Sequence, residues 1–149
     1  MSSFKSQKLF VLEANLDDMN PEWYEPLMEK LFEVGALDVT LTPVIMKKNR
    51  PGVIVGVLTT PKKKDRLLEI LFQESTTLGA RTYPVERFEL KRESKDVNTI
   101  YGKVSVKVGL DAAGRILNTA PEFESCKLLA KKKGVPLKKV YAAAIRACK

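Results

Sequence analysis

The N-terminal half of the chain repeats one pattern: an extended segment, a helix that begins at a proline, and a second extended segment. In the first copy, residues 8–15 include a continuous apolar run that predicts a strand. Asn20 and Pro21 then predict a helix start, because Asn favours the N-cap position and Pro the first helical position. Gly35 predicts the end of this helix, and residues 37–42 alternate between apolar and polar, as in a half-buried strand.

The second copy has the same order of signals. Residues 53–58 are nearly all apolar, Thr60 and Pro61 repeat the helix start, Gly79 predicts the helix end, and residues 81–90 predict a strand. Strand, helix and strand therefore occur twice in succession. This order predicts an α+β unit of the form βαββαβ.

The distribution of apolar residues and prolines in the four strands predicts their order in the sheet. The first and third are continuously apolar, which is typical of central strands. The second and fourth are bounded or interrupted by Pro43 and Pro84, and proline is confined to sheet edges because it cannot donate a ladder hydrogen bond. Central first and third strands give the ferredoxin-like arrangement, so we predict a ferredoxin-like sandwich.

The rest of the chain predicts a smaller second part. Residues 91–98 are charged and polar and predict a loop, while residues 103–108 alternate like a strand and 111–114 resemble a turn. Two helices are expected over residues 121–133 and 136–148. We therefore expect a ferredoxin-like unit over 1–92, followed by a β-hairpin and two C-terminal helices over 93–149.

The amino-acid composition limits which partners, nucleophiles and metal ligands the chain can use. The chain has 149 residues, a net charge of +8 and no histidine. The positive charge favours anionic partners. Without histidine, Ser-His-Asp and Cys-His nucleophiles are excluded and any metal must be held by oxygen, as Mg²⁺, Mn²⁺ or Ca²⁺ would be. No apolar run is long enough to span a membrane and no apolar signal core is present, so we expect a cytoplasmic protein with Cys126 and Cys148 reduced.

A basic cluster at residues 47–50 is the first candidate site. Three cations and one amide stand together directly before a Pro-Gly pair. Guanidinium groups form paired hydrogen bonds with phosphate oxygens, and ammonium groups add point charge, so the cluster suits a polyphosphate. A solvated hairpin tip is the equally weighted alternative. The cluster comprises Lys47, Lys48, Asn49 and Arg50.

Two further clusters carry candidate ligands. Asp17 and Asp18 lie between the first strand and its helix, where they suit either a divalent cation bridging to phosphates or local helix caps. Thr76, Thr77 and Arg81 follow the second helix and suit either phosphate or a helix end with an exposed arginine. We expect these loops to lie at opposite ends of their helices, so that one chain does not unite them. This expectation predicts a homo-oligomer with a site shared between subunits.

The predicted sheet lacks the features of a nucleic-acid-binding surface. RNA-binding sheets of this topology stack bases on aromatic side chains, whereas the third strand, residues 52–57, has none. No Walker or Rossmann glycine pattern occurs. A regulatory domain that senses a small anion or nucleotide, and a nucleic-acid binder that uses charge alone, remain as alternatives to an enzyme module.

Five segments together carry a family resemblance. Residues 15–22, 46–52, 74–81, 101–104 and 120–124 occur in the order found in the C-terminal part of the nickel-insertion family, LarC, which the chain resembles from about residue 9 onward. That family loads nickel into pyridinium bis-thiocarboxylate mononucleotide to give the nickel-pincer cofactor of lactate racemase. Its members use CTP with manganese or magnesium, and the C-terminal part is where CTP binds.

The resemblance implies a CTP-binding module of a CTP-dependent nickel chelatase, a metal-inserting lyase. Asp17 and Asp18 would hold Mn²⁺ or Mg²⁺. Full-length members also have an N-terminal part with histidine-rich sequence associated with nickel, and this chain lacks it. The resemblance therefore implies that nickel is bound mainly by that part. The chain is then either a fragment of a longer protein or a separately encoded C-terminal half, and in the second case the N-terminal part would be a partner. Nucleotide contacts would come from Lys47, Lys48, Asn49, Arg50, Thr76, Thr77 and Arg81.

Overall fold

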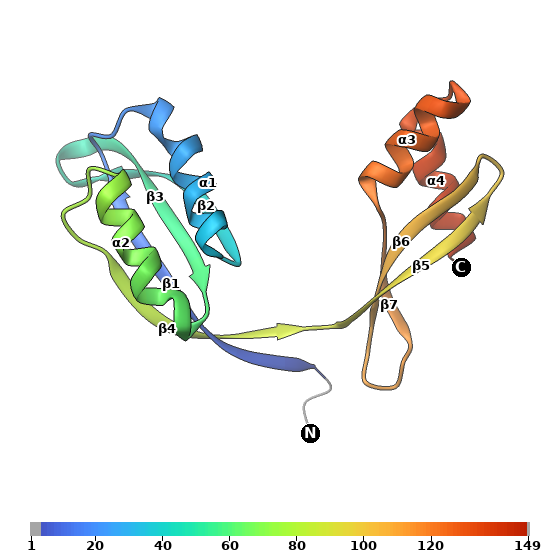
Figure 1. Cartoon of the computed structure of the whole chain (residues 1–149), viewed down its shortest axis with the longest axis horizontal. Helices are drawn as coiled ribbons and strands as arrows, with labels where there is room; N and C mark the ends of the chain where they lie inside the picture. Colours follow the sequence, from blue (N-terminus) through green and yellow to red (C-terminus); the bar gives the residue numbers. More distant parts are fainter. Residues whose placement is uncertain (1–3, 149) are drawn as a thin grey trace. The chain divides into compact units, whose positions relative to one another are not determined.

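The computed structural model describes residues 4–148, which divide into two compact units. One unit spans Ser6–Arg87, and the other consists mainly of the residues from Phe88 onward (Figure 1). Each unit has its own antiparallel sheet and its own pair of α-helices, and each is described here by itself. The predicted α+β class is confirmed.

The first unit is built on a four-stranded sheet. Its order is β2-β3-β1-β4, so the first and third strands are central and the two strands that contain proline are at the edges, as predicted. β3 pairs antiparallel with both β1 and β2, from Phe10↔Thr59 to Leu16↔Val53 on one side and from Asp38↔Leu58 to Met46↔Arg50 on the other. The strands are β1 (Lys5–Leu16), β2 (Asp38–Met46), β3 (Arg50–Thr59) and β4 (Arg81–Glu89).

Two helices, α1 (Tyr24–Val34) and α2 (Lys64–Glu74), lie along one face of this sheet (Figure 1). The core between the sheet and these helices is made of fully or almost fully buried aliphatic side chains. They drive the packing, because burial of each one contributes about 1.5–3 kcal/mol. Strand residues and helix residues contribute to it about equally. The most buried are Leu12, Leu16, Val55 and Val57 from the strands and Leu27, Leu31, Leu67 and Leu71 from the helices.

The helix signals in the sequence are only partly confirmed. A short 3-10 turn, η1 (Pro21–Trp23), leads into α1, and the Asn20 side chain accepts a hydrogen bond from the Glu22 N–H at 3.1 Å, as an N-cap should. Gly35 has φ 102° and ends α1, which is also as predicted. Thr60 is different, because it precedes the corresponding turn η3 (Pro61–Lys63) but makes no side-chain cap bond.

The predicted end of the second helix is wrong. α2 ends at Glu74 rather than at Gly79, because Ser75 is extended with φ −131° and ψ 173°. The Ser75 hydroxyl donates to the Leu71 carbonyl at 2.5 Å and so satisfies one of the carbonyls that the helix end leaves free. Residues 75–80 are therefore loop, and this loop carries part of the candidate site.

The second unit has a three-stranded sheet, β5-β6-β7, with two helices packed on it. Residues 91–98, predicted as a loop, belong instead to β5, which pairs with β6 from Lys91↔Leu110 to Thr99↔Gly102. The sequence hid this strand because its charged side chains face solvent and only Glu93, Val97 and Thr99 are partly buried. The elements are β5 (Lys91–Thr99), β6 (Gly102–Leu110), β7 (Ile116–Pro121), α3 (Phe123–Lys133) and α4 (Leu137–Ala147).

The core of the second unit lies between this sheet and its helices. Val104, Val106 and Val108 of β6 are buried against Cys126 of α3 and Val140 of α4. Both cysteines of the chain are free thiols. Across residues 4–148, no helix has the length and apolar character needed to cross a membrane.

Candidate functional site

All three clusters lie at one end of the first unit. β1 and β2 run in the same direction, because each is antiparallel to β3, so the end of β1 and the β2–β3 turn are at the same end of the sheet. The start of β4 is there too, since Arg81 bonds to Asn15 near the end of β1. The expectation that one chain does not unite the three clusters is therefore wrong, because it assigned the loops to opposite ends of the helices.

The basic cluster forms the tight turn between β2 and β3. Residues Lys47–Asn49 make one 3-10 turn, η2, and Met46 pairs with Arg50 across the hairpin. Lys48 and Asn49 have φ of 59° and 58°. This left-handed conformation costs a residue with a side chain about 1–2 kcal/mol, although asparagine tolerates it better than lysine. Backbone strain of this kind is common at functional sites. The strained turn here carries a row of exposed polar side chains.

The acidic pair connects the other two clusters. Arg50 Nη1 donates to Asp17 Oδ2 at 3.1 Å, and Thr76 Oγ1 donates to Asp18 Oδ1 at 2.5 Å. Among residues 4–148, neither carboxylate accepts from a backbone N–H of the helix start, which Asn20 caps instead. Asp17 and Asp18 therefore do not cap the helix, and this alternative is wrong. Both carboxylates bond to side chains from other loops.

Arg81 belongs to a network on strands β1 and β4. Its Nη2 donates to Asn15 Oδ1 at 2.6 Å and to Glu13 Oε2 at 3.4 Å, and the Tyr83 hydroxyl donates to Glu13 Oε1 at 2.7 Å. This hydrogen bond to Glu13, with a smaller effect of burial, raises the pKa of the Tyr83 phenol. Glu13 and Tyr83 are not among the site residues predicted from the sequence. The signal was available, since polar Glu13 and Asn15 alternate with apolar residues in a central strand.

The two threonines of the third cluster have different roles. Thr76 is the residue that reaches Asp18. Thr77 is buried, and its hydroxyl donates to the Gly79 carbonyl at 2.7 Å and accepts from the Gly79 N–H at 3.3 Å. Thr77 thus holds the shape of the loop, whereas Thr76 contacts the acidic pair.

The charge of the site is close to balanced. The three clusters and Glu13 together carry four cations and three carboxylates. Arg50 pairs with Asp17 and Arg81 with Glu13, and neither Lys47 nor Lys48 has an ion pair within the described residues. The net charge of the chain lies elsewhere. Of its 26 basic residues, eight fall within 125–149, which contain no aspartate or glutamate, and the remaining 18 match the 18 acidic residues of the chain. The overall charge therefore gives no support to this particular site.

A divalent cation fits the acidic pair only with help from a ligand. No group of three or more His, Cys, Asp or Glu side chains within residues 4–148 is arranged to hold a metal. Mg²⁺ and Mn²⁺ bound to nucleotides take one or two carboxylates and complete their shells with phosphate oxygens and water. Asp17 and Asp18 match that donor set, because they supply two adjacent carboxylates beside a basic turn.

Asp18 also acts on a neighbouring phenol. Burial, and then the negative charge of Asp18, raises the pKa of Tyr24, the first residue of α1. The ionisation of Tyr24 therefore reports on the charge at the acidic pair.

Comparison with known proteins gives consistent results over nearly the whole chain. A sequence model described as "nickel insertion protein" matches residues 1–141. The pyridinium-3,5-bisthiocarboxylic acid mononucleotide nickel insertion protein of Thermotoga petrophila is 49% identical over 142 residues, which are 95% of this chain and 36% of that protein. The protein of the same name from Clostridium kluyveri is 43% identical over 144 residues, 97% of this chain and 36% of its own length. The chain thus spans about a third of these relatives.

Two solved structures share the fold. One is described as LarC2, the C-terminal domain of a cyclometallase involved in the synthesis of the NPN cofactor of lactate racemase, in its apo form. It aligns with a TM-score of 0.87 at 35% identity, over 97% of this chain and 99% of its own. The protein MK0293 from Methanopyrus kandleri aligns with a TM-score of 0.70 at 24% identity, over 96% of this chain and 90% of its own, and shows the fold alone.

Proposed function

The chain belongs to the nickel insertion protein family, and from this premise we propose that it binds CTP with Mn²⁺ or Mg²⁺ as the nucleotide module of a nickel insertase. The observation that supports the proposal most is the meeting of three loops at one end of the sheet. Cations, carboxylates and hydroxyls gathered in that way suit a triphosphate and its metal ion together.

Each cluster has a distinct role in this proposal. Lys47, Lys48 and Arg50 neutralise the triphosphate, and Asn49 orients it. Asp17 and Asp18 hold the divalent cation, which offsets phosphate charge when bound. Thr76 and Arg81 add hydrogen bonds to phosphate oxygens, and Thr77 supports them by fixing the loop.

The wider activity is proposed from the relatives. The relatives quoted above are named as nickel insertion proteins of pyridinium-3,5-bisthiocarboxylic acid mononucleotide. We propose that this chain contributes to the same reaction, with nickel as the transferred substrate and the mononucleotide as its acceptor. An N-terminal part of the family type, either on the same polypeptide or separately encoded, completes the reaction in this proposal, because the chain matches only about a third of the relatives. We also propose a cytoplasmic location for this chain.

A homo-oligomer remains a prediction, but the argument from separated clusters no longer supports it. The three clusters meet within one chain, so a shared site is not needed to bring them together. Light scattering tests the assembly directly, against a monomer mass of 16.7 kDa.

Thermal unfolding tests the proposed function. The chain is heated with CTP, with inorganic tripolyphosphate and with neither, each in the presence and absence of Mn²⁺. We expect CTP with Mn²⁺ to stabilise the fold by about 3 kcal/mol at roughly 100-fold excess over its dissociation constant. No shift with either phosphate compound would refute the proposal.

A further inference from the structure

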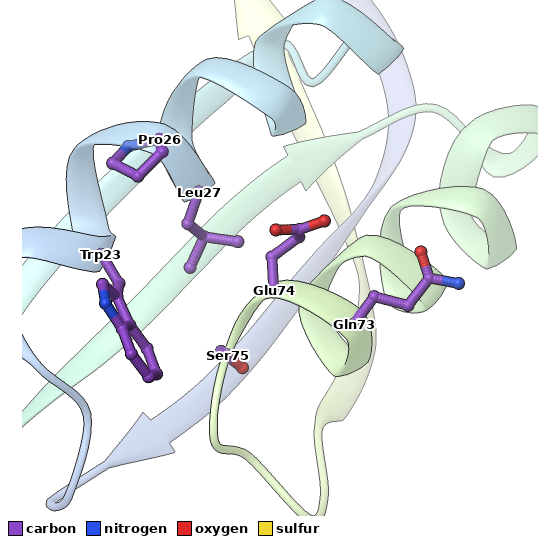
Figure 2. A pocket seen from close by; sticks show the side chains of 6 residues that line it. All are labelled: Trp23, Pro26, Leu27, Gln73, Glu74 and Ser75. Carbon is purple, nitrogen blue, oxygen red and sulfur yellow. The ribbon is translucent and has the colours of Figure 1, made fainter.

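A hollow of about 420 Å³ opens where β1, β4 and the turn before α2 meet. Its volume falls within the range of small-molecule sites. It lies at the start of α2, whereas the pocket between Trp23 and Glu74 lies at the other end of that helix (Figure 2). No residue that lines the hollow belongs to the candidate site. The lining residues include Lys8, Phe10, Pro61, Pro84, Val85 and Glu86.

Rigid apolar side chains make most of the surface of this hollow. Phe10 contributes an aromatic ring, and Lys64 Nζ lies 5.3 Å from the centre of that ring, a contact that helps to hold the ring in place. Pro61 and Pro84 contribute rings that have little conformational freedom to lose when a ligand packs on them. The hollow therefore offers an apolar ligand group a wall that is already formed.

Two opposite charges border this apolar wall. Lys8 comes from β1 and Glu86 from β4, which are neighbouring strands of the sheet, and both residues are exposed. Opposite charges on neighbouring strands stabilise a sheet when they pair. Lys8 and Glu86 do not pair with each other, and neither has another ion pair within residues 4–148. Each is therefore free to bind a ligand group of the opposite charge.

The two charges restrict the class of ligand. An ammonium group donates hydrogen bonds to a carboxylate, so Lys8 suits a carboxylate of the ligand and Glu86 suits an ammonium group. A ligand with one charge satisfies only one of these side chains and meets a like charge on the other. A zwitterion satisfies both, and an apolar group attached to it can pack on the wall of the hollow.

We propose that this hollow binds a free amino acid with an aromatic side chain. Lys8 holds the carboxylate of the ligand, and Glu86 holds its ammonium group. The side chain of the ligand packs on Phe10, Pro61 and Pro84, and an aromatic ring gains from contact with Phe10 beyond the burial of its surface. This inference goes beyond the proposed function, because it concerns a different ligand and different residues.

Four compounds test which ligand groups the hollow recognises. The chain is titrated with L-phenylalanine, with hydrocinnamate, which lacks the ammonium group, with phenethylamine, which lacks the carboxylate, and with glycine, which lacks the ring. Calorimetry measures the affinity, and nuclear magnetic resonance of the isotope-labelled chain locates the binding through the backbone amides of Phe10 and Val85. We expect L-phenylalanine to bind about tenfold or more tightly than each of the other three compounds.

Two variants assign the charged groups. Lys8→Ala should bind L-phenylalanine and phenethylamine with similar affinity, and Glu86→Gln should bind L-phenylalanine and hydrocinnamate with similar affinity. Both side chains are exposed, so the melting temperature should stay close to that of the wild type. Lys132→Ala in α3 and Glu33→Gln in α1 make the same changes of charge outside the hollow. They should leave all four affinities unchanged.

Three results would overturn the inference. The first is that L-phenylalanine does not bind at any concentration up to its solubility limit. The second is that it binds but shifts amides elsewhere in the chain and not those of Phe10 and Val85. The third is that hydrocinnamate or phenethylamine binds the wild-type chain as tightly as L-phenylalanine, since the hollow would then recognise a single charge.

Discussion

Arg50 and Asp17 are 33 residues apart in the chain, and Arg50 Nη1 donates to Asp17 Oδ2 at 3.1 Å. This pair joins the basic turn to the acidic loop and neutralises one charge of each in the free protein. A triphosphate with its divalent cation can satisfy both partners at once, because the cation attracts the carboxylate and the phosphate attracts the guanidinium. In the proposed function, ligand binding therefore redirects this ion pair.

The first prediction concerns Arg50. Arg50→Ala should weaken binding of CTP with Mn²⁺ by about 1.5–3 kcal/mol, the range for a hydrogen bond to a charged group. The free energy of unfolding should change by less than about 1 kcal/mol, because the pair with Asp17 is largely exposed on the arginine side. Calorimetry and chemical denaturation measure the two effects.

A matched control removes a charge from another place. Lys132→Ala lies in the last turn of α3, in the second unit, and also lowers the net charge by one. It should leave CTP binding unchanged. Equal losses in both variants would show that binding depends on general charge attraction rather than on the turn.

The second prediction concerns the acidic pair. The double variant Asp17→Asn, Asp18→Asn should abolish the dependence of nucleotide binding on Mn²⁺, while the melting temperature falls little. The control is Asn20→Ala, which removes the helix cap and should cost about 1 kcal/mol of stability without changing the metal dependence. A large loss of stability in the double variant, with metal dependence intact, would show that the two carboxylates stabilise the fold and do not bind the metal.

The third prediction concerns Tyr24. Asp18→Asn should lower the pKa of the Tyr24 phenol, because the negative charge of Asp18 disfavours tyrosinate. The pKa should remain above its usual value, since burial is the larger cause. A raised folded-state pKa stabilises the fold below the unfolded pKa of about 10, and this contribution is lost as the pH rises through the folded-state pKa.

Ultraviolet titration of tyrosinate measures this shift, and Tyr24→Phe identifies the transition that belongs to Tyr24. Identical titration curves for the wild type and Asp18→Asn would contradict the assigned coupling.

The fourth prediction concerns Gly52, which packs beneath the basic turn. A Cβ atom at this position would lie 2.7 Å from the Leu16 carbonyl oxygen and 2.6 Å from Met46 Sδ. The Leu16 backbone immediately precedes Asp17, so Gly52→Ala should shift the acidic loop. We expect a destabilisation of about 1–3 kcal/mol, measured by chemical denaturation, and weaker CTP binding.

Gly79→Ala is the corresponding control in the third loop. A Cβ atom at Gly79 has nothing within 4 Å. Stability and CTP binding should therefore stay close to wild type. If the two variants behaved alike, the close approach at Gly52 would not be the cause.

The sequence predicted the architecture of the first unit because local signals and packing agree there. The continuous apolar runs of β1 and β3 are central strands, and Pro43 and Pro84 lie on edge strands. β5 was missed because its exposed charged residues conceal the alternation that marks a strand. The end of α2 was missed because Gly79 resembles a helix stop, whereas a bond from the Ser75 hydroxyl ends the helix earlier.

The residues proposed for the site can be chosen from the sequence, whereas their arrangement cannot. Charge and turn chemistry are local properties, so Asp17, Asp18 and Lys47–Arg50 stand out in the sequence alone. Their contacts depend on strand direction, which decides that Asp18 meets Thr76 and Asp17 meets Arg50. The pocket between Trp23 and Glu74 could not be predicted, because it forms only when α1 and α2 pack side by side.

Calorimetric titration of the chain with CTP, UTP, ATP and GTP, each with and without Mn²⁺, is the decisive measurement for the proposed CTP site. We expect CTP with Mn²⁺ to bind more tightly than the other three nucleotides, and its affinity to fall when Mn²⁺ is omitted. Equal affinity for all four nucleotides, or no binding of any of them, would contradict it.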